Sequence, residues 1–207
     1  FASLFQQPIR DEFGFFPFLS LFGDPAAGKS TLGIILNRAL SFADWEGIPM
    51  SRTNTLKGPQ RIIASQSSVA VPLLEWTQKS KITEEDLLNL YGGNPQQVKA
   101  ERTPDSYVEV PFRCSLVIIT NTEPFSLRQV KERIISLKFN KDELTPESKK
   151  AALMLKNIKP ERMVTIGVQL LQDRKYFEPE ITNAIGEAIE VLEANGIDDR
   201  RIADNHG

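Results

Sequence analysis

One stretch of the chain has the residue types and the spacing of a phosphate-binding loop. Residues 23–31 fit the pattern G-x-x-x-x-G-K-[ST]. The glycines allow the backbone to curl so that its N–H groups point at phosphate oxygens. Lys29 is expected to meet the β- and γ-phosphates, and the Ser30 hydroxyl is a natural Mg²⁺ ligand. The motif therefore predicts a site for ATP or GTP with Mg²⁺. The residues of this P-loop are Gly23, Asp24, Pro25, Ala26, Ala27, Gly28, Lys29, Ser30 and Thr31.

The motif needs a strand before it and a helix after it, and the sequence indicates both. Residues 15–22 form an apolar run, as expected for a parallel strand that is buried on both faces. Residues 29–40 have helical periodicity, with Leu32, Ile35 and Leu36 on one face. The start of that helix adds partial positive charge beside the loop. The alternative without chemistry is a glycine turn before a helix, with Lys29 in solvent.

Three further polar residues lie at the ends of predicted strands. Glu75 closes the apolar run 69–74, where a carboxylate could hold Mg²⁺ through water or orient the attacking water. Asn121 closes the β-branched run 116–120 and could hydrogen-bond the γ-phosphate and the attacking water. Arg133 precedes the predicted strand 134–139 and could stabilise charge on the transferred phosphoryl group, often in a neighbouring subunit. Taken singly, each also fits a solvated strand end or a turn.

The remaining patterns predict an α/β fold with a central parallel sheet, followed by helices. We expect a leading helical segment in residues 1–14, an α/β core in 15–140 and a helical region in 141–207. Within the core, the expected elements are a weak strand at 48–53, a helix at 56–65, a helix at 84–90 that Thr83 caps with Asp86, and a β-hairpin formed by 97–103 and 107–112. In the last region, Pro146, Pro160 and Pro179 each stand at the expected start of a helix.

Composition excludes several classes of protein. The chain has 207 residues, of which 41% are hydrophobic and 25% charged, as in globular proteins. Its one cysteine, Cys114, excludes an internal disulfide. Its one histidine, His206, stands at the end of the given sequence, which argues against a Ser-His-Asp triad. We find no apolar run that could span a membrane and no secretory signal, so we expect a cytoplasmic protein. Because the chain begins at Phe1 without Met, we expect a piece of a longer protein.

The order of these features is more specific than any one of them. The chain has, in order, a P-loop, an acidic strand end, a hairpin, a strand that ends in Asn, and an Arg. This order resembles that of the superfamily 3 helicases. These are a branch of the AAA+ ATPases that includes viral replication initiators and primase-helicases of the poxvirus and phage kind. At Glu75 the chain has one acid where many ATPases have two. The matching stretches are 21–31, 72–76, 91–93 with Lys99 and Arg102, 117–124 and 132–139.

The resemblance implies a DNA helicase motor of a replication protein, with ATP bound between the subunits of a hexameric ring. In such a ring Glu75 would activate water, Asn121 would sense the γ-phosphate, and Arg133 would reach the neighbour's nucleotide. The hairpin would face the pore, where Lys99 and Arg102 would contact the phosphates of single-stranded DNA.

Two other functions share parts of this pattern. An AAA+ remodelling or switch ATPase that acts on protein has the same core, and the net charge of −2 favours it over a nucleic-acid-binding protein, which would usually be basic. A small-molecule kinase would need acceptor-binding residues and an arginine-rich lid, and the sequence shows neither near Gly23. The expected C-terminal helices fit a lid, a collar or a docking unit equally well.

Overall fold

The computed structural model describes residues 2–41, 45–52, 55–94, 96–99 and 107–195. Its centre is a five-stranded sheet with the strand order β2-β3-β6-β1-β7, in which every pairing is parallel. This confirms the predicted α/β fold. The strands are β1 (Phe18–Gly23), β2 (Ile48–Pro49), β3 (Ser67–Leu74), β6 (Arg113–Ile119) and β7 (Ile134–Phe139).

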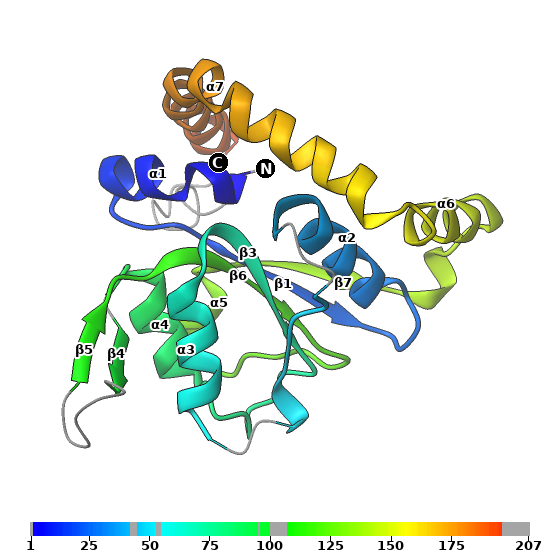
Figure 1. The fold of residues 1–207 in the computed structure, drawn as a ribbon, viewed down its shortest axis with the longest axis horizontal. Helices are drawn as coiled ribbons and strands as arrows, with labels where there is room; N and C mark the ends of the chain where they lie inside the picture. The colour runs from blue at the N-terminus through cyan, green and yellow to red at the C-terminus, as the bar shows by residue number, and fades with distance from the viewer. Residues whose placement is uncertain (1, 42–44, 53–54, 95, 100–106, 196–207) are drawn as a thin grey trace.

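Helices cover both faces of the sheet, with α1, α2 and α7 on one side and α3 and α4 on the other (Figure 1). The helical elements of the first half are η1 (Ala2–Phe5), α1 (Gln6–Phe13), α2 (Lys29–Ser41), η2 (Met50–Arg52), α3 (Lys57–Ser65) and α4 (Glu84–Tyr91). Those of the second half are α5 (Arg128–Lys131), η3 (Lys141–Glu143), α6 (Pro146–Lys156) and α7 (Pro160–Ala194). None of the helices in the described ranges is long and apolar enough to cross a membrane.

The alternation of side chains along β6 divides the core between the two faces. Leu116 and Ile118 belong to the cluster that includes residues of α3 and α4. Val117 and Ile119 belong to a second cluster, against which Leu32 of α2 packs. Because both faces are buried, β6 reads in the sequence as a continuous apolar run.

The predicted hairpin is present as two antiparallel strands, β4 (Gln96–Lys99) and β5 (Tyr107–Val110). The backbone of Lys99 pairs with that of Tyr107 at the far end of the ladder. Arg102 lies outside the described residues. The predicted cap of α4 is also confirmed, because the Asp86 N–H donates to Thr83 Oγ1 at 3.2 Å and the Thr83 N–H donates to Asp86 Oδ2 at 2.9 Å.

Three predicted elements were wrong in extent. The strand expected at 48–53 is only the two-residue β2, because Pro49 has no N–H to donate to the β-ladder and the chain turns into η2. The two helices expected from Pro160 and Pro179 are the single helix α7. Leu170 and Ile181, on either side of Pro179, both pack on the cluster formed by η1, α1 and Phe16. Pro179 removes one hydrogen bond from the helix, and this packing offsets the lost stability. The axis of α7 changes direction in this region, which is orange in Figure 1.

Candidate nucleotide-binding site

The P-loop lies between the carboxyl end of β1 and the first turn of α2, which begins at Lys29. Gly23 and Gly28 have φ angles of 118° and 94°, in the left-handed region that favours glycine. A Cβ atom on Gly23 would lie 2.3 Å from the carbonyl oxygen of Phe139, and the Asp24 N–H donates to that same oxygen at 2.9 Å. The start of the loop is therefore pressed against the end of β7, and this contact requires glycine.

Lys29 is the buried cation of the loop. Its Nζ donates to the carbonyl oxygens of Gly23 at 2.8 Å and Asp24 at 2.5 Å. Burial lowers the pKa of Lys29, and the nearby charge of Asp24 opposes that shift. A phosphate oxygen carries charge and is a stronger acceptor than a backbone carbonyl. Lys29 is thus held where it can exchange these carbonyl oxygens for phosphate oxygens.

A pocket of about 380 Å³ opens beside the loop. Asn121 belongs to its lining because β6 is the neighbour of β1, with Leu21 paired to Ile119, so the two strands end at the same edge of the sheet. The structure therefore brings Asn121 and the P-loop to the same pocket. The lining residues are Ala26, Ala27, Gly28, Lys29, Ser30, Thr31, Asn121, Leu144, Ser148, Lys149 and Ala152.

The second wall of this pocket comes from the segment that leads into α6 and from α6 itself. Leu144, Ser148, Lys149 and Ala152 form this wall. The sequence patterns predicted a helix here but gave no sign that it faces the P-loop. A pair of adjacent lysines at the start of a helix was the only available signal, and such pairs are common on solvated surfaces.

Glu75 lies at the same edge of the sheet, but it does not line the pocket. Its strand, β3, is separated from β1 by β6. Glu75 has a φ angle of 55°, and its Oε2 accepts a hydrogen bond from the hydroxyl of Ser51 in η2. The described residues contain no group of three or more His, Cys, Asp or Glu side chains that could hold a metal ion. Mg²⁺ commonly binds through one or two protein groups, phosphate oxygens and water, which is the kind of site that Ser30 could complete.

Arg133 lies where the parallel strands begin, whereas the P-loop lies where they end. It precedes β7, whose first residue, Ile134, pairs with Phe18, whereas Gly23 pairs with Phe139 at the other end. The length of β1, about 17 Å at about 3.3 Å per residue, separates these two ends of the strands. Arg133 Nη1 donates to the carbonyl oxygen of Gln129 at 3.1 Å, and its guanidinium lies 5.6 Å from the ring centroid of Tyr91. The structure therefore does not bring Arg133 to the pocket of its own chain.

Glu84 holds the segment that connects Asn121 to Arg133. Its carboxylate accepts hydrogen bonds from the Leu127 N–H at 2.8 Å, the Ser126 hydroxyl at 2.8 Å and the Ser126 N–H at 3.0 Å. Burial alone would raise the pKa of Glu84, but these hydrogen bonds and the charge of Lys131 outweigh it and lower the pKa. The sequence showed Glu84 only as an acid in the first turn of a helix, without its distant partners.

The packing of Trp76 gives this segment a second attachment. Trp76 directly follows Glu75 and is fully buried, and its ring centroid lies 5.4 Å from that of Phe125. Its backbone N–H donates to the carbonyl oxygen of Ile119 at 3.2 Å. Trp76 therefore packs against residues on both sides of Asn121, and it belongs to the same core cluster as Val130 and Ile134.

No protein-family model and no curated protein matches this chain. Among solved structures, it is similar to the helicase of JCV, a polyomavirus, in a complex with N-(4-(2-(thiazolo[5,4-c]pyridin-2-yl)phenoxy)phenyl)acetamide, with 12% identity and a TM-score of 0.47. A second structure of JCV helicase has 13% identity and a TM-score of 0.42. Both likenesses cover 94% of this chain but only 63% and 60% of the helicase chains. Because both TM-scores are below 0.5, the likeness carries no functional conclusion.

Proposed function

We propose that this chain hydrolyses ATP in the pocket between the P-loop, β6 and α6, as the motor of a DNA helicase in a replication protein. The observation that carries this proposal is the meeting of Lys29, Ser30 and Asn121 in one pocket. These residues supply a cation for the β- and γ-phosphates, a hydroxyl for Mg²⁺ and an amide for the γ-phosphate. The motif order supports the superfamily 3 kind of helicase, including the primase-helicases of phages and poxviruses.

In the proposed reaction, water attacks the γ-phosphorus while the bond to the bridging oxygen breaks, which releases ADP and phosphate. Asn121 orients the attacking water and hydrogen-bonds the γ-phosphate. Glu75 takes up the proton of that water, and for this step its carboxylate has to leave the Ser51 hydroxyl and move into the pocket, which it does not line in this structure. Ser30 would hold Mg²⁺, which would neutralise charge on the phosphate oxygens.

The position of Arg133 supports a site that two subunits share. The guanidinium lies too far from the pocket of its own chain to contact a nucleotide there. In the proposed ring it would instead contact the nucleotide of an adjacent copy. We therefore propose a homo-oligomer, as a hexameric ring, in which Arg133 completes the neighbour's site. We further propose that the motor acts on replicating DNA in the cytoplasm of a bacterium or of a virus-infected cell.

Single-stranded DNA is the proposed substrate of translocation, with Lys99 and Arg102 of the hairpin as its phosphate contacts. A remodelling ATPase that acts on protein is the second candidate. The described strands of the hairpin favour the remodelling ATPase in one respect. They carry one cation, Lys99, and one anion, Glu109, and so have no net charge to attract DNA.

Stimulation of ATP hydrolysis by single-stranded DNA separates these two functions. The account predicts a several-fold higher turnover with an oligonucleotide of mixed sequence, and a falling stimulation as salt rises, because phosphate contacts release counterions. Lys99→Ala should reduce the stimulation without changing basal hydrolysis, whereas the exposed Lys159→Ala should change neither. ATP hydrolysis that is unchanged by DNA but stimulated by an unfolded protein would favour the remodelling function.

A further inference from the structure

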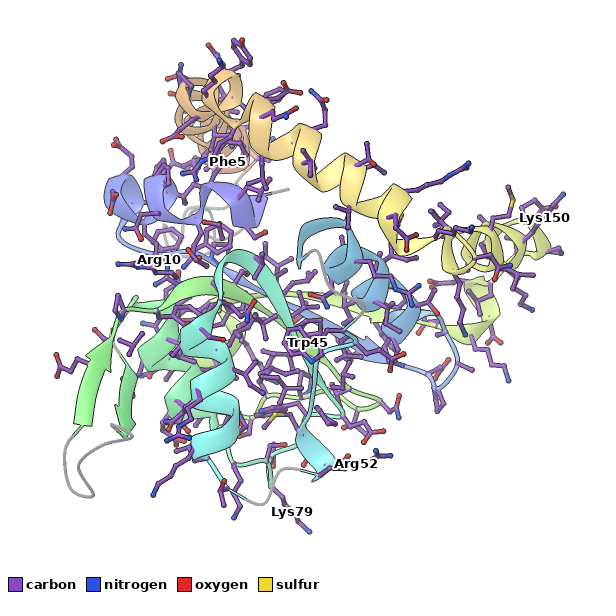
Figure 2. The ribbon with its side chains drawn as sticks, in the orientation of Figure 1. Phe5, Arg10, Trp45, Arg52, Lys79 and Lys150 are labelled. Atoms are coloured by element: carbon purple, nitrogen blue, oxygen red, sulfur yellow. The ribbon has the colours of Figure 1, made fainter. Side chains whose placement is uncertain are left out.

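The wall that α6 contributes to the pocket contains a second lysine. Lys149 lines the pocket together with Lys29, although it lies far outside the P-loop motif. Its neighbour Lys150 is exposed and does not line the pocket. Figure 2 shows Lys150 at the outer end of the molecule, directed away from the pocket. Successive residues of a helix point in different directions, so the chain offers two adjacent lysines of which one faces the candidate site.

The charges in this pocket are unbalanced. Its lining contains two lysines and three hydroxyl groups, and none of the lining residues is Asp or Glu. Among the described residues, no carboxylate pairs with the Lys149 ammonium. A concave site that is lined by two cations raises the local concentration of anions, and Asp24, the acid whose charge acts on Lys29, lies outside the lining. The chemistry of the lining therefore fits a ligand that carries several negative charges.

The α6 wall is fastened to the P-loop from which Lys29 comes. Asp24 Oδ2 accepts a hydrogen bond from the backbone N–H of Lys141 at 2.8 Å, just before the residues that lead into α6. Thr145 then caps α6 through the Ser148 N–H at 3.1 Å. The two walls of the pocket are thus joined through Asp24 and Lys141, and each wall contributes one lysine to the lining.

We propose that Lys149 binds the phosphate chain of ATP from the α6 wall, so that the bound nucleotide links α6 to the P-loop. This inference rests on the proposed nucleotide-binding function. In this role α6 is a second phosphate-binding element. Its sequence fitted a lid, a collar or a docking unit equally well.

Titration of the purified chain with Mg-ATP tests this inference through a set of matched variants. Lys149→Ala should weaken binding about tenfold, the low end of what a hydrogen bond to a charged group contributes. Lys149→Arg keeps the charge and should restore most of the affinity. Lys150→Ala should bind like the wild type, because Lys150 does not face the pocket. Equal affinities for the Lys149→Ala and Lys150→Ala variants would overturn the inference.

Two further readouts define the contact. Inorganic tripolyphosphate should compete with ATP, and Lys149→Ala should weaken its binding by a factor similar to that for ATP. An effect on ATP alone would contradict the phosphate contact. In hydrogen exchange, ATP should protect α6 in the wild type but not in Lys149→Ala. If α6 is protected equally in both proteins, Lys149 does not link it to the nucleotide.

ATP binding by the Lys29→Ala variant separates the P-loop site from the role of Lys149. If the wild-type chain binds Mg-ATP and Lys29→Ala does not, the P-loop site stands whatever Lys149 does. If the wild type binds neither ATP nor tripolyphosphate, the nucleotide site and the role of Lys149 fail together.

Discussion

Asp24 Oδ2 accepts a hydrogen bond from the backbone N–H of Lys141 at 2.8 Å, and this contact joins the P-loop to the segment that leads into α6. The Asp24 N–H donates in turn to Phe139 at the end of β7. One residue of the loop therefore contacts both the sheet and the segment that carries the second wall of the pocket. The geometry of the pocket depends on this residue as well as on the glycines and Lys29.

Replacement of Asp24 tests that dependence. Asp24→Ala removes the acceptor for the Lys141 N–H and should weaken Mg-ATP binding several-fold, because an exposed hydrogen bond contributes about 0.5–1.5 kcal/mol. Asp24→Asn keeps an acceptor oxygen and should bind ATP nearly as well as the wild type. Titration calorimetry measures both variants. If both lose affinity equally, the negative charge of Asp24 matters and its hydrogen bond does not.

Gly23 and Gly14 form a matched pair for testing the close approach of the loop to β7. Both have positive φ angles, 118° and 80°, but a Cβ on Gly14 meets nothing within 4 Å. Gly14→Ala should therefore cost only the left-handed strain of about 1–2 kcal/mol. Gly23→Ala adds a collision with the Phe139 carbonyl and should lower the free energy of unfolding further and also abolish ATP binding. Equal losses of stability, measured by chemical denaturation, would contradict the collision.

Glu84 should make stability depend on pH. Its pKa is lowered in the folded protein, so its contribution is complete above the unfolded pKa near 4.5 and is lost as pH falls through the lower folded value. At neutral pH Glu84→Gln should cost about 1–3 kcal/mol, because the amide presents donors to the Ser126 and Leu127 N–H groups. The difference from wild type should shrink toward pH 3. The exposed Glu85→Gln is the control, and a difference that stays constant with pH would count against the hydrogen-bonded carboxylate.

A site shared between subunits predicts complementation. Arg133→Ala should abolish ATP hydrolysis but leave ATP binding intact, because Arg133 lies at the edge of the sheet away from its own pocket. Glu75→Ala should also be inactive. A mixture of the two variants should regain activity at interfaces that combine an intact Glu75 with an intact Arg133. If no activity returns although the two chains co-assemble, Arg133 does not complete the neighbour's site.

The sequence was sufficient to predict the P-loop, its flanking elements and the nearness of Asn121. These features depend on local pattern and on one general rule, that parallel strands bring their carboxyl ends to one edge of a sheet. Residues 69–74 and 116–120 are apolar because their strands are buried on both faces, so their polar final residues were visible as strand ends.

The rest depends on contacts between segments that are distant in the chain. Lys149 faces the pocket only because α6 folds back beside the P-loop, and the partners of Glu84 lie 42 and 43 positions away. The path of α7 through Pro179 is set by its packing on η1 and α1. Local propensity made Pro179 a helix start, and tertiary packing overrode it. Glu75 is an intermediate case, because its strand end was predictable but its hydrogen bond to Ser51 was not.

Steady-state phosphate release by the purified chain with Mg-ATP measures whether the pocket beside Lys29 hydrolyses ATP. We expect measurable turnover for the wild type and for Lys150→Ala, and its loss in Lys29→Ala, whose circular dichroism should show an unchanged fold. Wild-type turnover in the Lys29→Ala variant would show that ATP is not hydrolysed in this pocket.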